Sequence, residues 1–200
     1  RASMGVIGFV VPAMPDITLH GGERISTGSF NFEVLWTPGH SPGHICLYEP
    51  AKKILLSGDH ILPNITPNVS LHVQALGNPL GDYIKSLQAI KQLDVDIVLP
   101  AHEDVFHGLR RRIEELLHHH EERKAAIVEV IRHEPKTAYQ IASEIPWLPN
   151  GISTPWESLS PSDKRLAVME SLAHLELLRS EEKVERMLKD SIVFYSANEK

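Results

Sequence analysis

Three short motifs place imidazole and carboxylate side chains directly after stretches that are typical of β-strands. The motifs are TPGHSPGH at 37–44, LLSGDH at 55–60 and VLPAH at 98–102. Imidazole and carboxylate are ligands that zinc, iron and manganese accept. Because each motif follows an expected strand, we predict that His40, Asp59 and His102 meet at one edge of a sheet and form a metal site.

Hydrophobic periodicity predicts the elements that position these motifs. Short apolar or alternating runs predict strands, and apolar residues three or four positions apart predict helices. The turn at 49–53 joins two of the strands as a hairpin. Strands are expected at 32–36, 44–48, 54–56 and 96–100, and helices at 81–93 and from 109 onward. Alternating strands and helices make the first region α/β.

The chain changes character beyond about residue 124. Three helical patterns follow one another, and Ser-Pro-Ser-Asp at 160–163 offers cap side chains for the third. Two short strands then close the chain. The helices are expected at 125–133, 137–145 and 162–178, and the strands at 183–188 and 191–195. This is the element order of a winged helix, so we predict two domains, 1–123 and 124–200.

Taken together, the three motifs resemble the second half of the metallo-β-lactamase-fold hydrolases, in particular the glyoxalase-II and lactamase-beta-like branch. The segment NPLGDY at 78–83, followed by Ser86 and Leu87, is also similar to that branch. The resemblance covers about residues 16–123. It implies half of an αβ/βα sandwich, an α/β fold, followed by a small α+β winged helix.

The resemblance also implies two metal ions, bridged by a carboxylate and a hydroxide. The expected metal is zinc, with iron and manganese as alternatives. His40 matches a ligand of the first metal, His102 a ligand of the second, and Asp59 the bridging and catalytic carboxylate. His44 and His60 lie beside ligand positions without matching them, which favours a supporting role. A departure from the family is Glu103, where glycine is usual.

The family's His-x-His-x-Asp-His motif, which provides further ligands, has no match in this sequence. The nearest pattern is HHHEE at 118–122, which lies in an expected helix and ends in Arg123 where the motif has histidine. Alternate helical residues point about 200° apart and cannot easily share a metal, so a solvated helix face is the favoured interpretation. The N-terminal half of the domain is therefore expected to be absent, and metal binding weak or absent. The parent protein is expected to hydrolyse ester, thioester, lactone or phosphodiester bonds of a small-molecule substrate, with this chain inactive alone.

Two alternatives stay open: a non-catalytic binding or assembly fragment, and a winged-helix module that binds nucleic acid. Residues 124–200 carry ten Lys and Arg against twelve Asp and Glu, a net charge of −2. A DNA-binding face normally concentrates positive charge, so DNA binding is not expected. An RNA substrate stays open for the parent, because the resembling branch includes endoribonucleases.

Composition narrows the remaining classes. The whole chain carries a formal charge of −6, which gives no overall attraction to nucleic acid or anionic membranes. No apolar run is long enough for a membrane span. The single cysteine, Cys46, cannot form an internal disulfide, and no signal peptide is recognised. We therefore expect a cytoplasmic location.

The resemblance also predicts association with another chain. In the complete fold two sheets cover each other, so half a fold leaves one sheet face bare. Burial of apolar area stabilises by about 25 cal/mol per Å², so several hundred Å² are worth on the order of 10 kcal/mol. We expect a homo-oligomer, such as a homodimer, or association with the N-terminal half. The residues expected on this face are Val34, Trp36, Ile45, Leu47, Leu55 and Ile97.

Overall fold

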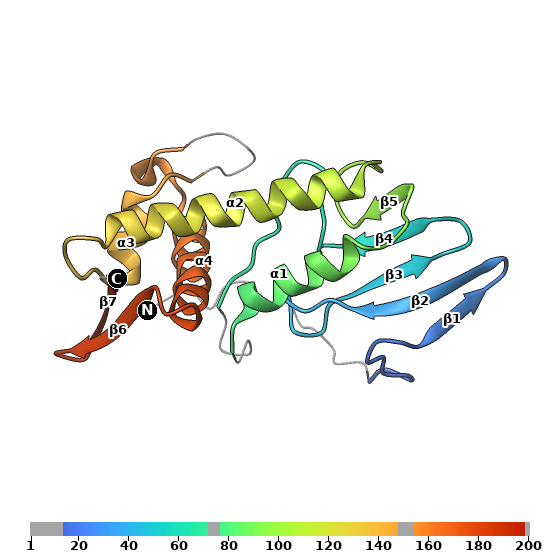
Figure 1. Ribbon diagram of the computed structural model, residues 1–200, viewed down its shortest axis with the longest axis horizontal. Coiled ribbons are helices and arrows are strands. Elements are labelled where there is room, and N and C mark those ends of the chain that lie inside the picture. The colour runs from blue at the N-terminus through green and yellow to red at the C-terminus, as the bar shows by residue number, and fades with distance from the viewer. Residues whose placement is uncertain (1–13, 72–76, 148–153, 199–200) are drawn as a thin grey trace.

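A five-stranded sheet forms the first part of the molecule. The computed structural model describes residues 14–71, 77–147 and 154–198. The spatial order of the strands is their order along the chain (Figure 1). The first four pair antiparallel, and the fifth runs parallel to the fourth. They are β1 (Arg24–Thr27), β2 (Phe30–Trp36), β3 (Ile45–Glu49), β4 (Ile54–Gly58) and β5 (Ile97–Pro100).

The four expected strands are thus confirmed within two residues or so, together with the hairpin between β3 and β4. The stretch before residue 32 has little periodicity and is expected to be loop with a short strand at most; β1 is a four-residue strand within it. The two helices of this part are also confirmed, α1 (Pro79–Ile90) and α2 (Leu109–Val130). A mixed sheet with helices packed on it makes this part an α/β fold.

The C-terminal part ends as the sequence predicts, with two helices and a β-hairpin, but the helix expected at 125–133 is not a separate element: it is the last part of α2. Helix α4 begins at the predicted cap, where the Ser160 hydroxyl accepts a hydrogen bond of 3.1 Å from the Asp163 amide. Of the helices in the described part of the chain, none is long and apolar enough to cross a membrane. The elements are α3 (Ala138–Glu144), the 3₁₀ helix η2 (Trp156–Ser158), α4 (Pro161–Ser180), β6 (Val184–Lys189) and β7 (Ile192–Ala197).

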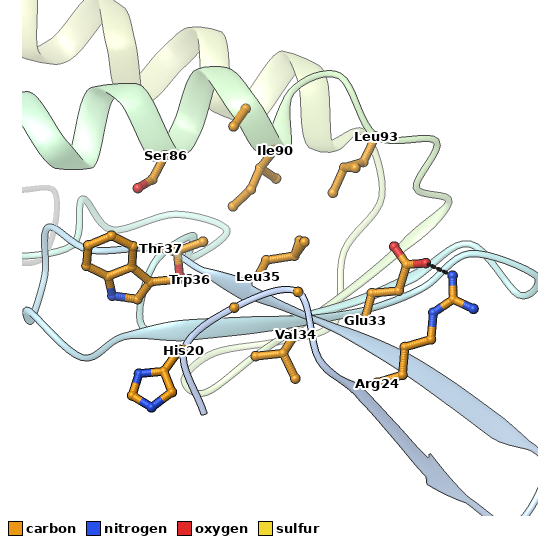
Figure 2. A pocket seen from close by; sticks show the side chains of 13 residues that line it. His20, Arg24, Glu33, Val34, Leu35, Trp36, Thr37, Ser86, Ile90 and Leu93 are labelled. Carbon is orange, nitrogen blue, oxygen red and sulfur yellow. Dashed lines mark hydrogen bonds and ion pairs between the residues drawn. The ribbon is translucent and has the colours of Figure 1, made fainter. Parts of the chain in front are cut away.

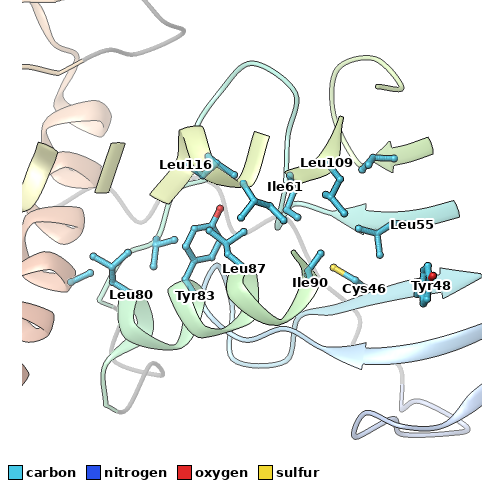
Figure 3. Packing of buried hydrophobic residues seen from close by; sticks show 14 of the residues in the cluster. Cys46, Tyr48, Leu55, Ile61, Leu80, Tyr83, Leu87, Ile90, Leu109 and Leu116 are labelled. Atoms are coloured by element: carbon cyan, nitrogen blue, oxygen red, sulfur yellow. The ribbon is translucent and has the colours of Figure 1, made fainter. Parts of the chain in front are cut away.

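One face of the sheet packs against α1 and α2 and forms the first hydrophobic core (Figure 3). The strand register places Leu35 beside Cys46, and Leu55 beside Val98. Cys46, Leu55 and Val98 are fully buried there. Burial raises the pKa of the Cys46 thiol to about 12, so the thiol stays protonated and acts as a core residue.

The opposite face of the sheet is only partly covered. Val34 and Leu47 lie on it, and Trp36 is 58% exposed. Ile45 and Ile97 are partly buried. The prediction of a bare face was wrong for two residues: Val34 is fully buried, and Leu55 points to the helix side. The uncovered apolar area is therefore smaller than the sequence indicated.

A second hydrophobic cluster joins the end of α2 to α3, α4 and the β6–β7 hairpin. Helices α2 and α4 contribute to both clusters: Ile113 and Ala173 belong to the first, Ile127 and Leu175 to the second. Along α2, the buried residues pass from the first cluster to the second near the middle of the helix. We propose a domain boundary near residue 124, inside this shared helix, and a winged-helix relationship for the part that follows.

Two buried histidines connect α2 to α4. His120 Nδ1 and His174 Nε2 lie 3.2 Å apart, and His174 Nδ1 donates to the Glu170 carbonyl at 2.9 Å. Burial, the largest cause, lowers the pKa of His174 to about 3 and that of His120 well below its usual value. Both imidazoles are therefore neutral in the folded protein near pH 7.

We expect stability to fall as the pH drops below about 6.5, because the unfolded chain then binds protons that folded His174 does not. The loss continues until the pH nears 3, and His174 alone accounts for about 2 kcal/mol at pH 5. Urea unfolding at pH 7, 6 and 5 measures it. The His174→Asn variant should flatten this dependence, whereas His118→Asn, at a side chain 74% exposed, should not. Equal slopes for wild type and His174→Asn would contradict the assignment.

Candidate metal centre

The structure brings the three predicted site residues together at the end of the sheet. His102 Nε2 lies 3.2 Å from Asp59 Oδ1, and His40 Nε2 lies 3.9 Å from Asp59 Oδ2. Each imidazole thus faces a different oxygen of one carboxylate. This is the arrangement expected of a carboxylate that bridges two cations, each with one histidine.

His40 is fixed by the turn that follows β2. Gly39 has φ +144°, and its Cα packs so closely on Tyr83 of α1 that an added Cβ would lie 2.4 Å from the Tyr83 Cβ. His40 Nδ1 lies 2.8 Å from the Asn68 carbonyl, to which it can only donate. The neutral ring therefore carries its lone pair on Nε2, the nitrogen that faces Asp59.

Asp59 and His102 are adjacent because β4 and β5 are parallel neighbours. The Ala101 amide donates to the Gly58 carbonyl at 3.0 Å, which ties the two strand ends together. The side chains of Asp59 and His102 are 36% and 68% exposed. Both can therefore reach a solvent-borne ion.

The two other histidines of these motifs, His44 and His60, contact the residues around the three predicted ligands. His44 Nδ1 is 2.8 Å from Thr37 Oγ1, and its Nε2 lies against Gly58, where an added Cβ would be 2.6 Å away. His60 is fully buried, stacks on His44 and makes an edge-to-face contact with Tyr83. The supporting role of both histidines stays a prediction.

The residues fit part of a two-metal centre. The donor types suit zinc, iron or manganese, and the tautomer of His40 suits coordination. However, within the described ranges no three His, Cys, Asp or Glu side chains form a group that could hold a metal ion. Within the part of the chain that the structure describes, the ligand set is therefore incomplete.

A cavity of about 670 Å³ opens beside the three residues and extends to α2 and α4. Its far wall carries His119, Arg123 and Glu170, which sequence reasoning missed. The solvated face predicted for HHHEE is correct for His118 but wrong for His119 and His120: His119 lines the cavity, and His120 is 1% exposed. The helical spacing of His119 and Arg123, four residues apart on one face, was the available signal.

A second cavity, of about 610 Å³, lies between β2 and α1 (Figure 2). Ser86 and Ile90 point into it from the helix, Leu93 from the turn that follows the helix, and Leu35 points toward them from the sheet. It contains none of the three predicted ligands. The larger cavity is the one that can deliver a substrate to them.

The backbone conformation of Glu103 accounts for the family's usual glycine at this position. Its φ is +66°, in the left-handed region that glycine adopts freely. The carboxylate accepts hydrogen bonds from the Asn64 and Ile65 amides at 3.2 and 3.3 Å. Burial raises the pKa of the Glu103 carboxyl, but the hydrogen bonds from these amides and from the Asn64 side chain lower it by a larger amount. The pKa of Glu103 therefore lies below its usual value. Glu103 thus fastens a loop that lines the larger cavity.

We expect Glu103→Gly to release this loop with little effect on global stability, since relief of backbone strain offsets the lost hydrogen bonds. Hydrogen exchange should become faster at the Asn64 and Ile65 amides by about tenfold or more. Glu103→Gln, which keeps an acceptor, should change exchange less. Unchanged exchange in Glu103→Gly would show that the carboxylate does not hold the loop.

Residues 3–102 match the family model of the metallo-beta-lactamase superfamily. The chain is 26% identical over 172 residues to a probable metallo-hydrolase YqjP of Bacillus subtilis. It is 35% identical over 105 residues to the acyl-coenzyme A thioesterase MBLAC2 of Gallus gallus. Its fold matches the crystal structure of a metallo-beta-lactamase family protein from Thermus thermophilus, with a TM-score of 0.79 and 31% identity.

The Bacillus and Thermus matches cover most of this chain and the Gallus match covers half of it, but each covers only part of the other protein. They span 84% of this chain and 51% of the Bacillus protein, 50% and 36% for the Gallus protein, and 94% and 56% for the Thermus structure. The chain thus spans about half the length of the Bacillus relative and of the Thermus protein. On the family model and the shared fold, the chain belongs to the metallo-beta-lactamase superfamily.

Proposed function

We propose that this chain supplies part of a two-metal hydrolytic centre, acting on an ester, thioester, lactone or phosphodiester bond of a small molecule. The observation that carries the proposal is that His40 and His102 face opposite oxygens of the Asp59 carboxylate. Each metal would then have one histidine of this chain and a share of Asp59. Zinc is the expected metal, and iron or manganese suits the same donors.

Two metals held there would supply a nucleophile at neutral pH and polarise the bond under attack. The chain's own residues have simpler tasks. Asp59 would hold the two ions at a fixed separation, and Asn68 would keep His40 oriented through its carbonyl. The cavity beside them would bind the substrate and limit the access of water.

The names of the relatives bear on the substrate. The Bacillus relative is described as a probable metallo-hydrolase and the Gallus relative as an acyl-coenzyme A thioesterase. Thioesters are therefore the first substrate class to test. An RNA substrate for the whole protein is the second, whereas a DNA-binding role has little support from the acidic C-terminal part.

We propose that the remaining ligands come from outside this chain. A complete two-metal centre needs more protein ligands than His40, Asp59 and His102 provide. The partly covered sheet face offers a surface for an N-terminal half of the domain or for a second copy of the chain, with exposed Trp36 at its edge.

Metal uptake and turnover of the purified chain test this proposal together. After dialysis against zinc, manganese or ferrous iron, we expect fewer than two metals per chain by elemental analysis, and little hydrolysis of ester, thioester, lactone or phosphodiester substrates. Two tightly held metals with metal-dependent turnover would contradict the incomplete centre. No metal at all at millimolar concentrations would contradict the metal site itself.

A further inference from the structure

The far end of the larger cavity is built around one buried cation. Arg123, on α2, is 7% exposed and lines the cavity. One face of its guanidinium stacks on Trp147, with 4.2 Å between the guanidinium carbon and the ring centroid. Its Nη1 donates to the Pro146 carbonyl. The guanidinium is thus held in one orientation in the wall of the cavity that the predicted metal ligands also line.

The acidic side chains that line the cavity near Arg123 form no hydrogen bond with its guanidinium in the described part of the chain. Its Nε lies 4.0 Å from Glu170 Oε1, beyond hydrogen-bond distance. Burial raises the pKa of Glu170 to about 7, although Arg123 lowers it, so this carboxyl is partly protonated near neutral pH. The other acid of this wall, Asp163, accepts a hydrogen bond from Ser160 at the start of α4.

A guanidinium has five N–H donors in a planar fork that suits carboxylate and phosphate groups. Within the described residues, Arg123 has one hydrogen bond, to a carbonyl, and no carboxylate within hydrogen-bond distance, so its guanidinium is matched to an anion in the cavity. The cavity lining also contains apolar side chains, to which an apolar part of a ligand can bind. They include Leu62, Ile65, Leu159, Leu166 and Ala167.

We propose that Arg123 binds an anionic group of the substrate, a carboxylate or a phosphate, while an apolar segment spans the cavity toward Asp59. This inference rests on the proposed function, because it treats the same cavity as the substrate site. It defines the substrate as a molecule with an anionic end, an apolar middle and a hydrolysable bond. His119, beside Arg123 on the same wall, would contact the anion as a neutral ring, because burial, the largest cause, lowers its pKa to about 4.

The test compares octanoate, octyl phosphate and the neutral octanamide by calorimetry on the full chain. EDTA is present, so that no carboxylate can bind through a metal. We expect octanoate and octyl phosphate to bind about tenfold tighter than octanamide. Equal affinities of the three probes would overturn the proposal without any variant being needed.

Variants then locate the anion. Arg123→Met should lower octanoate affinity to that of octanamide, and Arg123→Lys should retain part of the difference. Arg111→Met, on the same helix with a side chain 86% exposed, is the matched control and should bind octanoate like the wild type. Unchanged octanoate binding in folded Arg123→Met would overturn the proposal.

A further variant separates this inference from the proposed function. His40→Ala should lose metal uptake and keep octanoate binding, whereas Arg123→Met should do the reverse. Loss of octanoate binding in folded His40→Ala would place the anion at the predicted metal ligands and overturn the role of Arg123.

Discussion

Replacement of Asp59 by asparagine should abolish detectable metal uptake by the chain, although the fold remains intact. Asparagine has the same shape but no negative charge, so it cannot attract two cations or coordinate through two equivalent oxygens. In the whole protein we expect activity to fall by roughly 1,000-fold or more. Stability should change by less than about 1 kcal/mol, because Asp59 and both histidines are partly exposed.

The matched control is Asp94→Asn. Asp94 is also an exposed carboxylate with a cationic partner, Lys53 Nζ at 2.7 Å, but it lies away from the three ligands. Elemental analysis after dialysis should show wild-type metal uptake in Asp94→Asn and none in Asp59→Asn. Equal uptake in both variants would place the metal elsewhere.

Gly39→Ala should have the second large effect, because it disturbs both the core and the metal site. A Cβ at residue 39 would lie 2.4 Å from the Tyr83 Cβ and 2.6 Å from its Cα, at a backbone φ of +144° that L-residues rarely adopt. The turn or α1 must therefore move. We expect a loss of about 3 kcal/mol or more in the free energy of unfolding. Metal uptake should fall with it, since His40 follows directly.

Gly43→Ala is the control within the same loop. An added Cβ there meets no heavy atom within 4 Å, and the backbone is not in the left-handed region. Its stability and metal uptake should match those of the wild type within about 0.5 kcal/mol and a factor of two. If Gly39→Ala behaved like Gly43→Ala in urea unfolding, the contact with Tyr83 would not fix the turn.

Much of the fold could be predicted because its elements have clear periods. Strand β3 and helix α1 carry regular apolar spacing, and α4 carries a cap at Ser160. The convergence of His40, Asp59 and His102 could be predicted because each follows a strand. The sequence could not show which side chains of each strand lie on the helix-covered face of the sheet and which lie on the opposite face. Leu55 and Val34 are both apolar, and only the register shows that they lie on opposite faces.

The far wall of the cavity was missed for a related reason. His119, Arg123 and Glu170 come from two helices that are distant in the chain, and they meet only because α2 packs on α4. A charged residue in an amphipathic helix is usually solvated. Only the helical spacing separates buried Arg123, which is in line with the apolar positions Leu116 and Ile127, from exposed Arg111.

The most direct test of the central claim, that Asp59 bridges two metals, is an anomalous diffraction map from crystals soaked in zinc. We expect density about 2 Å from His40 Nε2 and from His102 Nε2, with each peak also within coordinating distance of one Asp59 oxygen. Partial occupancy agrees with the incomplete ligand set. Zinc bound only away from Asp59, or no peak beside either histidine at millimolar zinc, would contradict the account.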